Sequence, residues 1–201
     1  GNEADFDNHN RQRYPKKQYF GGGLIRYSQD NFSLHYRLDF QDESIINLGQ
    51  INDLDPDSEP TSSNQDYLTT RWMHQLQSEI QLGKWSINPV ISFTDYERIT
   101  ENYTTFLTSD LETDRRQTQS TFFRTFFFRN TASMNNLRWG SLQLGLESTI
   151  DNGGGSRLLD GEQFMEDVAL FASAEIKVSP AISIRPGIRH SYNSVYETAP
   201  T

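Results

Sequence analysis

Residues 31–43 read NFSLHYRLDFQDE, and the character of their side chains alternates without a break. Phe32, Leu34, Tyr36, Leu38 and Phe40 share one parity, and Ser33, His35, Arg37, Asp39 and Gln41 share the other. Successive side chains of a β-strand point to opposite faces, so this period of two predicts a strand with one apolar and one wet face. The apolar face suits either the core of a soluble sandwich or barrel or the lipid around a membrane barrel.

The composition favours a single β-domain. The chain has 201 residues, a length at which sandwiches and barrels commonly stay undivided. Hydrophobic residues make up 34% and mean hydropathy is -0.72, which is too polar for a helical membrane protein. Aromatic residues reach 12%, which is too many for a disordered chain. No run of about 18 apolar residues occurs, so no transmembrane helix is expected.

Charge and cysteine content exclude several function classes. The formal net charge is -9 and the pI is near 4.9, so we expect no nucleic-acid partner, because phosphate binding needs a basic surface. The absence of cysteine rules out disulfides, thiolate metal sites and a cysteine nucleophile. Residues 1–17 lack the apolar core of a signal peptide, and we predict a polar tail there, followed by one β-barrel segment over 18–201.

The alternating pattern recurs in eight segments bounded by turn residues. These expected strands cover 19–28, 31–43, 66–83, 85–100, 118–134, 138–150, 167–178 and 182–195. Several exceed ten residues, whereas strands of soluble proteins average about 5 to 6 and a strand crossing lipid needs about 9 to 11.

Short and long connections alternate along the chain. The short ones are expected at 28–31, 83–84, 135–136 and 179–181, and the long polar ones at 44–65, 101–117 and 151–166. Outer-membrane barrels have short turns at one end and long loops at the other, an order that a Greek-key sandwich has no reason to keep. The sequence therefore predicts an all-β, antiparallel up-and-down meander of about eight long strands, part of or closing into an outer-membrane-type β-barrel.

Aromatic and charged residues are distributed as such a barrel requires. Rings expected to form interfacial girdles are Trp72, Trp85, Trp139, Tyr27 and Tyr96. Charges opposite the aliphatic faces are Arg37, Asp39, Arg71, Glu79, Glu147, Glu175, Lys177, Arg185 and Arg189. Phenylalanines at 122–128 fall on both parities, which predicts a strand covered on both sides. The two glycine triplets are expected within a strand (21–23) and at a loop tip (153–155).

The last third of the chain resembles a known family. The stretches EDVALFASAEIKVSPAISIRPGIRHSYNSVYETAPT (166–201) and LQLGLESTIDNGGGSRLLDG (142–161) are similar to the barrel of TonB-dependent outer-membrane receptors, although His190 and Ser191 replace an expected Tyr and Asp. The resemblance implies a Gram-negative outer-membrane location, contact with outer-membrane lipid, and import of a small nutrient of the siderophore, cobalamin, glycan or peptide class. It also implies that this chain is an internal barrel segment, without the plug domain through which TonB acts.

Candidate site residues follow from parity and spacing. We expect Arg71, Arg185 and Arg189 to line the ligand path and the long loops to meet the ligand first. The sequence DLDPDSE places Asp53, Asp55 and Asp57 at alternate positions, a weak calcium candidate without the glycine and glutamate of an EF-hand loop. No arrangement of catalytic residues, other metal ligands or cofactor motifs is recognisable, so we expect neither enzymatic activity nor a cofactor. The alternative is a complete small β-barrel, soluble or eight-stranded and membrane-embedded, that binds a ligand or partner without transport.

Overall fold

The computed structural model describes residues 16–53, 58–113, 117–156, 161–195 and 197–200. Over these residues the chain forms one antiparallel sheet of twelve strands. The described residues include no helix that is long and apolar enough to cross a membrane. The strands are β1 (Lys16–Gln29), β2 (Phe32–Asn47), β3 (Ile51–Asn52), β4 (Thr61–Leu82), β5 (Trp85–Phe106), β6 (Leu111–Glu112), β7 (Gln117–Leu137), β8 (Gly140–Gly155), β9 (Glu162–Ser179), β10 (Ile182–Ile184), β11 (Gly187–Asn193) and β12 (Glu197–Pro200).

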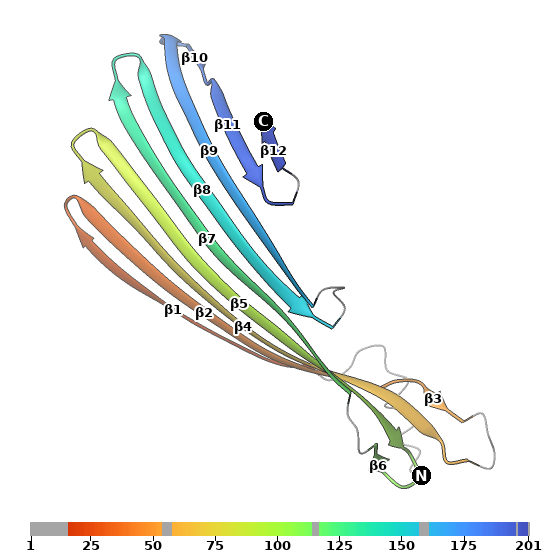
Figure 1. The fold of residues 1–201 in the computed structure, drawn as a ribbon. Helices are drawn as coiled ribbons and strands as arrows, with labels where there is room; N and C mark the ends of the chain where they lie inside the picture. The colour runs from red at the N-terminus through yellow and green to blue at the C-terminus, as the bar shows by residue number, and fades with distance from the viewer. Residues whose placement is uncertain (1–15, 54–57, 114–116, 157–160, 196, 201) are drawn as a thin grey trace.

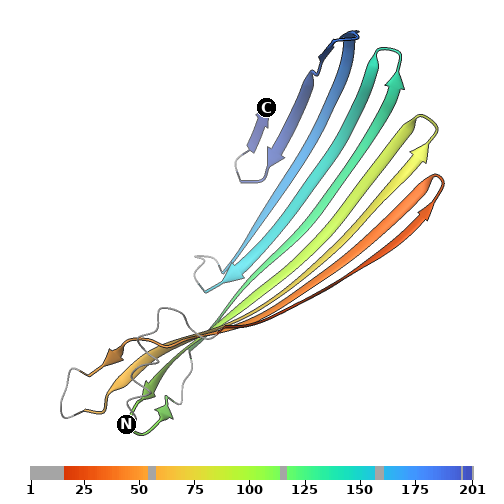
Figure 2. The same ribbon diagram turned by 180° about the vertical axis from the view of Figure 1, so that it is seen from behind.

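The strand order confirms the predicted meander. Along the sheet it is β1-β2-β4-β5-β7-β8-β9-β11-β12, with β3, β6 and β10 attached to β4, β5 and β9. Both views show a strongly twisted sheet in which the long strands run side by side (Figures 1 and 2). Within the described residues β1 and β12 stand at opposite edges and do not pair, so the sheet is open.

Short turns and longer connections lie at opposite ends of the sheet, as predicted (Figure 1). The three longer connections, at 48–60, 107–116 and 156–161, are shorter than expected because the strands continue into the predicted loops. β4 begins at Thr61, and β5 runs to Phe106. The β4 extension is polar on both faces, and the β5 extension is polar apart from Tyr103 and Phe106. Backbone pairing therefore continues where the regular polar/apolar alternation of a strand has ended.

The turn between β7 and β8 lies later than the predicted position at 135–136. β7 continues to Leu137, and its register against β8 shifts between Met134 and Leu137, which is the mark of a β-bulge. The turn residues are Arg138 and Trp139. Gly140 follows with φ 147°, and a Cβ there would lie 1.6 Å from the carbonyl oxygen of Glu175, so only glycine fits where the turn ends.

Two other boundaries differ from the sequence expectation. The strand expected at 182–195 is interrupted at Arg185 and Pro186, because proline has no N–H to donate to the ladder. The Pro186 carbonyl still accepts a bond from the Ala174 N–H at 3.0 Å, and the register is the same on both sides of the break. At the other end β1 begins at Lys16, within the predicted tail, and residues 1–15 lie outside the described part.

One face of the sheet carries an apolar band next to the short turns. We define the apolar band as the alternate residues Phe32–Phe40 of β2, Trp72–Leu82 of β4, Trp85–Phe93 of β5, Phe126–Met134 of β7, Leu142–Ile150 of β8 and Val168–Val178 of β9, which the cross-strand register places on one face. None of these positions is Asp, Glu, Lys or Arg. Nine residues of strand span roughly 30 Å, or about 23 Å at a tilt of about 40°.

The apolar band is not buried by any other part of the described chain. Tyr103 and Ala169 are the only buried hydrophobic residues among the described residues, at 9% and 4% exposure. Trp72, Leu76 and Phe126 of the band are 40%, 38% and 40% exposed. A soluble sandwich would cover such a face with a second layer, and the described residues form no second layer over this sheet.

The band ends abruptly on the side of the longer connections. The Phe40 and Trp72 rings lie 4.3 Å apart between centroids at this edge, in agreement with an aromatic boundary. The next positions on the same face carry Asp95 and Arg124, whose ion pair measures 3.1 Å. Tyr96, expected in the same girdle, is on the opposite face, because it is one residue out of step with Trp85 and Phe93 along β5.

Candidate ligand path on the charged face

All nine charged residues singled out by parity lie on the face opposite the apolar band. The register brings Arg37, Asp39, Arg71, Glu79, Glu147, Glu175, Lys177, Arg185 and Arg189 to this charged face. Several of them pair there: the Arg37 Nε is 2.7 Å from Asp39 Oδ2, and Arg185 Nη2 is 3.0 Å from Glu175 Oε2. Arg71 is exposed and has no ion pair with another described residue.

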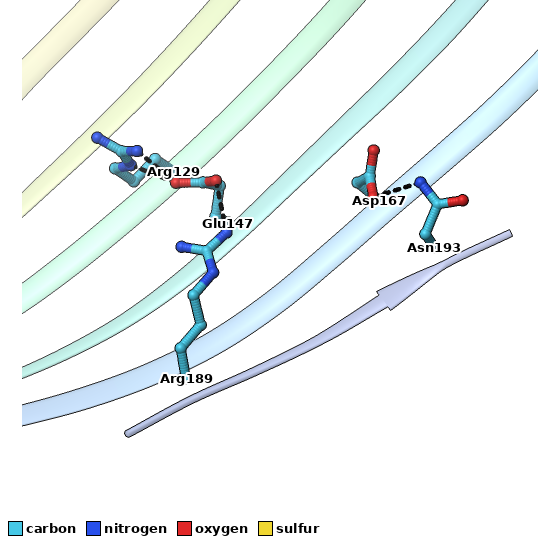
Figure 3. A network of polar contacts seen from close by, with 5 residues as sticks. All are labelled: Arg129, Glu147, Asp167, Arg189 and Asn193. Atoms are coloured by element: carbon cyan, nitrogen blue, oxygen red, sulfur yellow. Dashed lines mark hydrogen bonds and ion pairs between the residues drawn. The ribbon is translucent and has the colours of Figure 1, made fainter. Parts of the chain in front are cut away.

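Glu147 joins three strands of the charged face (Figure 3). Its carboxylate accepts bonds from Arg129 of β7, with Nε at 2.7 Å, and from Arg189 of β11, with Nη2 at 3.0 Å. In Figure 3 the Arg189 side chain extends from β11 across β9 to reach Glu147 on β8. A second bond nearby joins the Asn193 Nδ2 to Asp167 Oδ1 at 2.6 Å.

Small residues leave space for the Arg189 side chain to extend across β9 to Glu147. Ala169 stands directly opposite Glu147 on β9 and is 4% exposed, so no bulky side chain stands between Arg189 and the carboxylate. Phe171 stands next to Arg189, whose Cζ is 6.0 Å from the ring centroid. The Phe171 ring lies on Gly145, where an added Cβ would be 2.0 Å from the ring. Gly145 and Ala169 thus position the aromatic and the cation together.

Replacing Glu147 with alanine is expected to lower the free energy of unfolding by about 1 to 2 kcal/mol. The change leaves Arg129 and Arg189 without their shared anion, but both side chains are about half exposed, so the cost stays below the 3 to 5 kcal/mol of a fully buried pair. Glu79→Ala is the control, since the only polar contact of the Glu79 carboxylate with another described residue is the 2.9 Å bond that it accepts from the Gln81 amide. Urea unfolding measures the loss in both variants, and equal losses would contradict a special role for Glu147.

A cavity of about 930 Å³ opens where the charged face approaches the longer connections. Its walls include Tyr67, Tyr96 and Phe123, and its charged groups are Arg98 and Asp151. The Arg98 Cζ lies 5.7 Å from the Tyr67 ring centroid and 5.8 Å from that of Tyr96, and its Nε donates to Thr69 Oγ1 at 3.1 Å. Asp151 Oδ1 accepts a 2.6 Å bond from the Thr125 hydroxyl. We call this space the loop-end cavity.

Glycines of β8 form part of the cavity and correct two sequence expectations. Gly153 and Gly154 belong to the strand rather than to a loop tip. A Cβ at Gly153 would lie 3.2 Å from the Phe123 ring, and one at Gly154 would lie 2.3 Å from the Phe122 ring. The two rings therefore lie against glycines on opposite faces of the neighbouring strand. Phenylalanine on both faces here does not require a covering layer, because glycine leaves space for each ring.

Beyond the cavity, β4 and β5 carry a polar projection with β3 and β6 (Figure 2). Ser62 is fully buried and donates to the Gly49 carbonyl at 3.0 Å, while Asn64 Nδ2 donates to Thr105 Oγ1 at 2.8 Å. Hydrogen bonds from Ser109, with a lesser one from the Thr108 backbone, lower the pKa of Glu59, while desolvation acts in the opposite direction. The contact therefore stabilises the folded state at pH values above the pKa that Glu59 has in the unfolded chain. This stabilisation is lost as the pH falls through the lower pKa that Glu59 has in the folded chain.

Only one residue of the predicted calcium site lies within the described residues. Asp53 is exposed in the connection after β3, and Asp55 and Asp57 lie outside the described residues. Within the described ranges no three His, Asp or Glu side chains come together in a way that suits a metal ion. The weak calcium site therefore stays a prediction.

The three arginines expected to line a ligand path share the charged face but occupy different levels. Arg185 is near the short turns, Arg189 is in the middle, and Arg71 stands opposite Tyr96 beside the loop-end cavity. Sequence reasoning missed Arg98, Asp151 and Tyr67 as one site. The sequence indicates which side chains of one strand share a face, but it does not indicate which residues of different strands become neighbours.

Comparisons with known proteins do not assign this chain to a family. The features that bear on function are thus an open meander, an uncharged apolar band on one face, and paired charges with an aromatic cavity on the other. The chain matches no protein-family model, no curated protein and no solved structure.

Proposed function

We propose that the chain is a segment of the β-barrel of a TonB-dependent receptor in the outer membrane of a Gram-negative bacterium. In this proposal the apolar band meets lipid and the charged face lines a wet lumen. The intact receptor binds a small nutrient at its outer end and imports it. On this proposal TonB acts through a plug domain of the receptor.

The observation that carries the proposal is the exposed, uncharged apolar band. It crosses six neighbouring long strands, it has about the height of a hydrocarbon layer, and it ends at the Asp95–Arg124 ion pair. Charge on a lipid-facing surface is costly at the middle of the bilayer and tolerated at the interfaces, which agrees with this distribution.

The second face and the connections support transport rather than anchoring alone. Cations and carboxylates that pair along β7, β8, β9 and β11 suit a water-filled interior, where their exposed ends stay hydrated. The resemblance of residues 142–161 and 166–201 to TonB-dependent receptors adds the importer class. Unpaired edges at β1 and β12 agree with a sheet that continues into further strands.

The proposal is tested by sizing with light scattering, with and without detergent. We expect aggregation in buffer, a defined particle in detergent, and flotation with phosphatidylcholine vesicles after refolding. A compact monomer that needs no detergent and does not float would overturn the membrane assignment. The chain would then be a soluble β-protein that binds a ligand or partner without transport.

A further inference from the structure

We propose that the loop-end cavity binds a neutral oligosaccharide. This inference rests on the proposed function, because it names the class of nutrient that the receptor would take. It concerns the cavity next to the longer connections, which on that proposal opens toward the outside of the cell.

The charges of the cavity select against strongly ionic ligands. Arg98 and Asp151 are the only charged residues in its described lining, so their formal charges cancel. Neither has an ion pair with another described residue, and the formal charge of the whole chain is -9. A polyanion such as a ferric catecholate would meet one cation beside a carboxylate in a negative field, which opposes its binding.

Aromatic surface is available inside the cavity for an apolar ligand face. Phe123, on the charged face, is 47% exposed. Tyr67 and Tyr96 are oriented through their contacts with Arg98, which lies within 6 Å of both rings. Each pyranose ring has a face of C–H groups that packs against an aromatic ring, whereas its edge carries hydroxyls.

The polar groups between the rings match hydroxyl edges. A hydroxyl both donates and accepts, so it is best held by groups that supply donors and acceptors side by side. Arg98 supplies donors, Asp151 supplies acceptors, and the Gln119 and Gln163 amides supply both. The positions of Arg98 and Asp151 are set by Thr69 and Thr125, so part of the ordering cost is met before a ligand arrives.

The geometry leaves room for several sugar units in an extended site. At about 930 Å³ the cavity lies near the upper end of the usual range for small-molecule sites, about 300 to 1,000 Å³. Gly153 and Gly155 line it without side chains, which keeps the space between Phe123 and Gln163 open. The arrangement suits a chain of neutral hydroxylated rings better than a compact charged chelate.

The test uses the full chain after its insertion into vesicles has been scored by flotation. Maltohexaose, cellohexaose, laminarihexaose and mannohexaose are each titrated by calorimetry, with tris(catecholato)iron(III) as the anionic competitor. We expect at least one hexasaccharide to bind and the iron complex not to compete. If inserted protein binds none of the four sugars, or prefers the iron complex, the ligand class is wrong while the membrane proposal stands. If sugar binds to a soluble monomer, the membrane proposal fails and the ligand class stands.

Variants separate the cavity from the rest of the charged face. Phe123→Ala is expected to weaken sugar binding roughly tenfold to hundredfold, and Asp151→Asn about tenfold. Phe127→Ala is the matched control, because Phe127 is on the same face of the same strand, four residues from Phe123, and does not line the cavity. Binding that Phe123→Ala and Phe127→Ala weaken equally would place the sugar elsewhere and overturn the proposal.

Discussion

Replacing Leu76 with arginine is expected to cost about 2 to 4 kcal/mol of insertion free energy, which lowers the inserted fraction roughly 30-fold to 1,000-fold. Leu76 lies near the middle of the part of β4 that belongs to the apolar band, between Trp72 at one edge and Leu82 at the short turn, and is 38% exposed. On the proposed function its side chain meets hydrocarbon, where a guanidinium loses its water without gaining a partner. Flotation with phosphatidylcholine vesicles measures the effect.

Two matched variants distinguish lipid contact from general disruption. Gln77→Arg places the same side chain one residue away on the charged face, where Gln77 is exposed, and is expected to insert normally. Leu82→Arg lies on the face of Leu76 but at the turn, so its cost should fall to about 0 to 1 kcal/mol. If Leu76→Arg and Leu82→Arg cost the same, the apolar band meets a protein core rather than a bilayer.

The meander was predictable because its signals are local. Alternation in residues 31–43 and 85–93 fixes which side chains share a face within one strand, and the alternation of short and long connections fixes the antiparallel order. The ends of the strands were not predictable in the same way. Beyond Glu43 in β2 and before Asp66 in β4 apolar and polar residues no longer alternate, so a paired strand and a loop cannot be told apart by the pattern there.

The candidate site depended on information that no single strand contains. Parity placed Arg71, Arg185 and Arg189 on one face, and the register agrees. The loop-end cavity, in contrast, requires Arg98 of β5 and Asp151 of β8, which flank β7, to lie on the same face of the sheet. That relation depends on two successive registers, and a shift of one residue in either would send one of the side chains to the opposite face.

The requirement for glycine at position 140 also depends on a neighbouring strand and could not be predicted from the sequence of β8 alone. Gly140→Ala is expected to destabilise the folded sheet by about 2 to 4 kcal/mol. Gly140 has φ 147°, a backbone conformation that other residues rarely adopt, and its missing Cβ would stand 1.6 Å from the Glu175 carbonyl oxygen and 2.7 Å from its carbon. Both contacts are to backbone, so the added methyl group can be accommodated only if β8 and β9 move apart.

Gly83 supplies the control for this substitution. It also has a positive φ, 63°, at the start of a two-residue turn, but an added Cβ there would meet nothing within 4 Å. Gly83→Ala should therefore cost only the conformational term, about 1 to 2 kcal/mol. Urea unfolding in detergent micelles, followed by tryptophan fluorescence, compares the stability of the two variants.

Gly140→Ala should also weaken the neighbouring 2.8 Å bond from the Lys177 N–H to the Trp139 carbonyl. The expected sign is faster amide hydrogen exchange at Lys177. Equal losses of stability in the two variants would show that φ alone, and not contact with β9, requires glycine at 140.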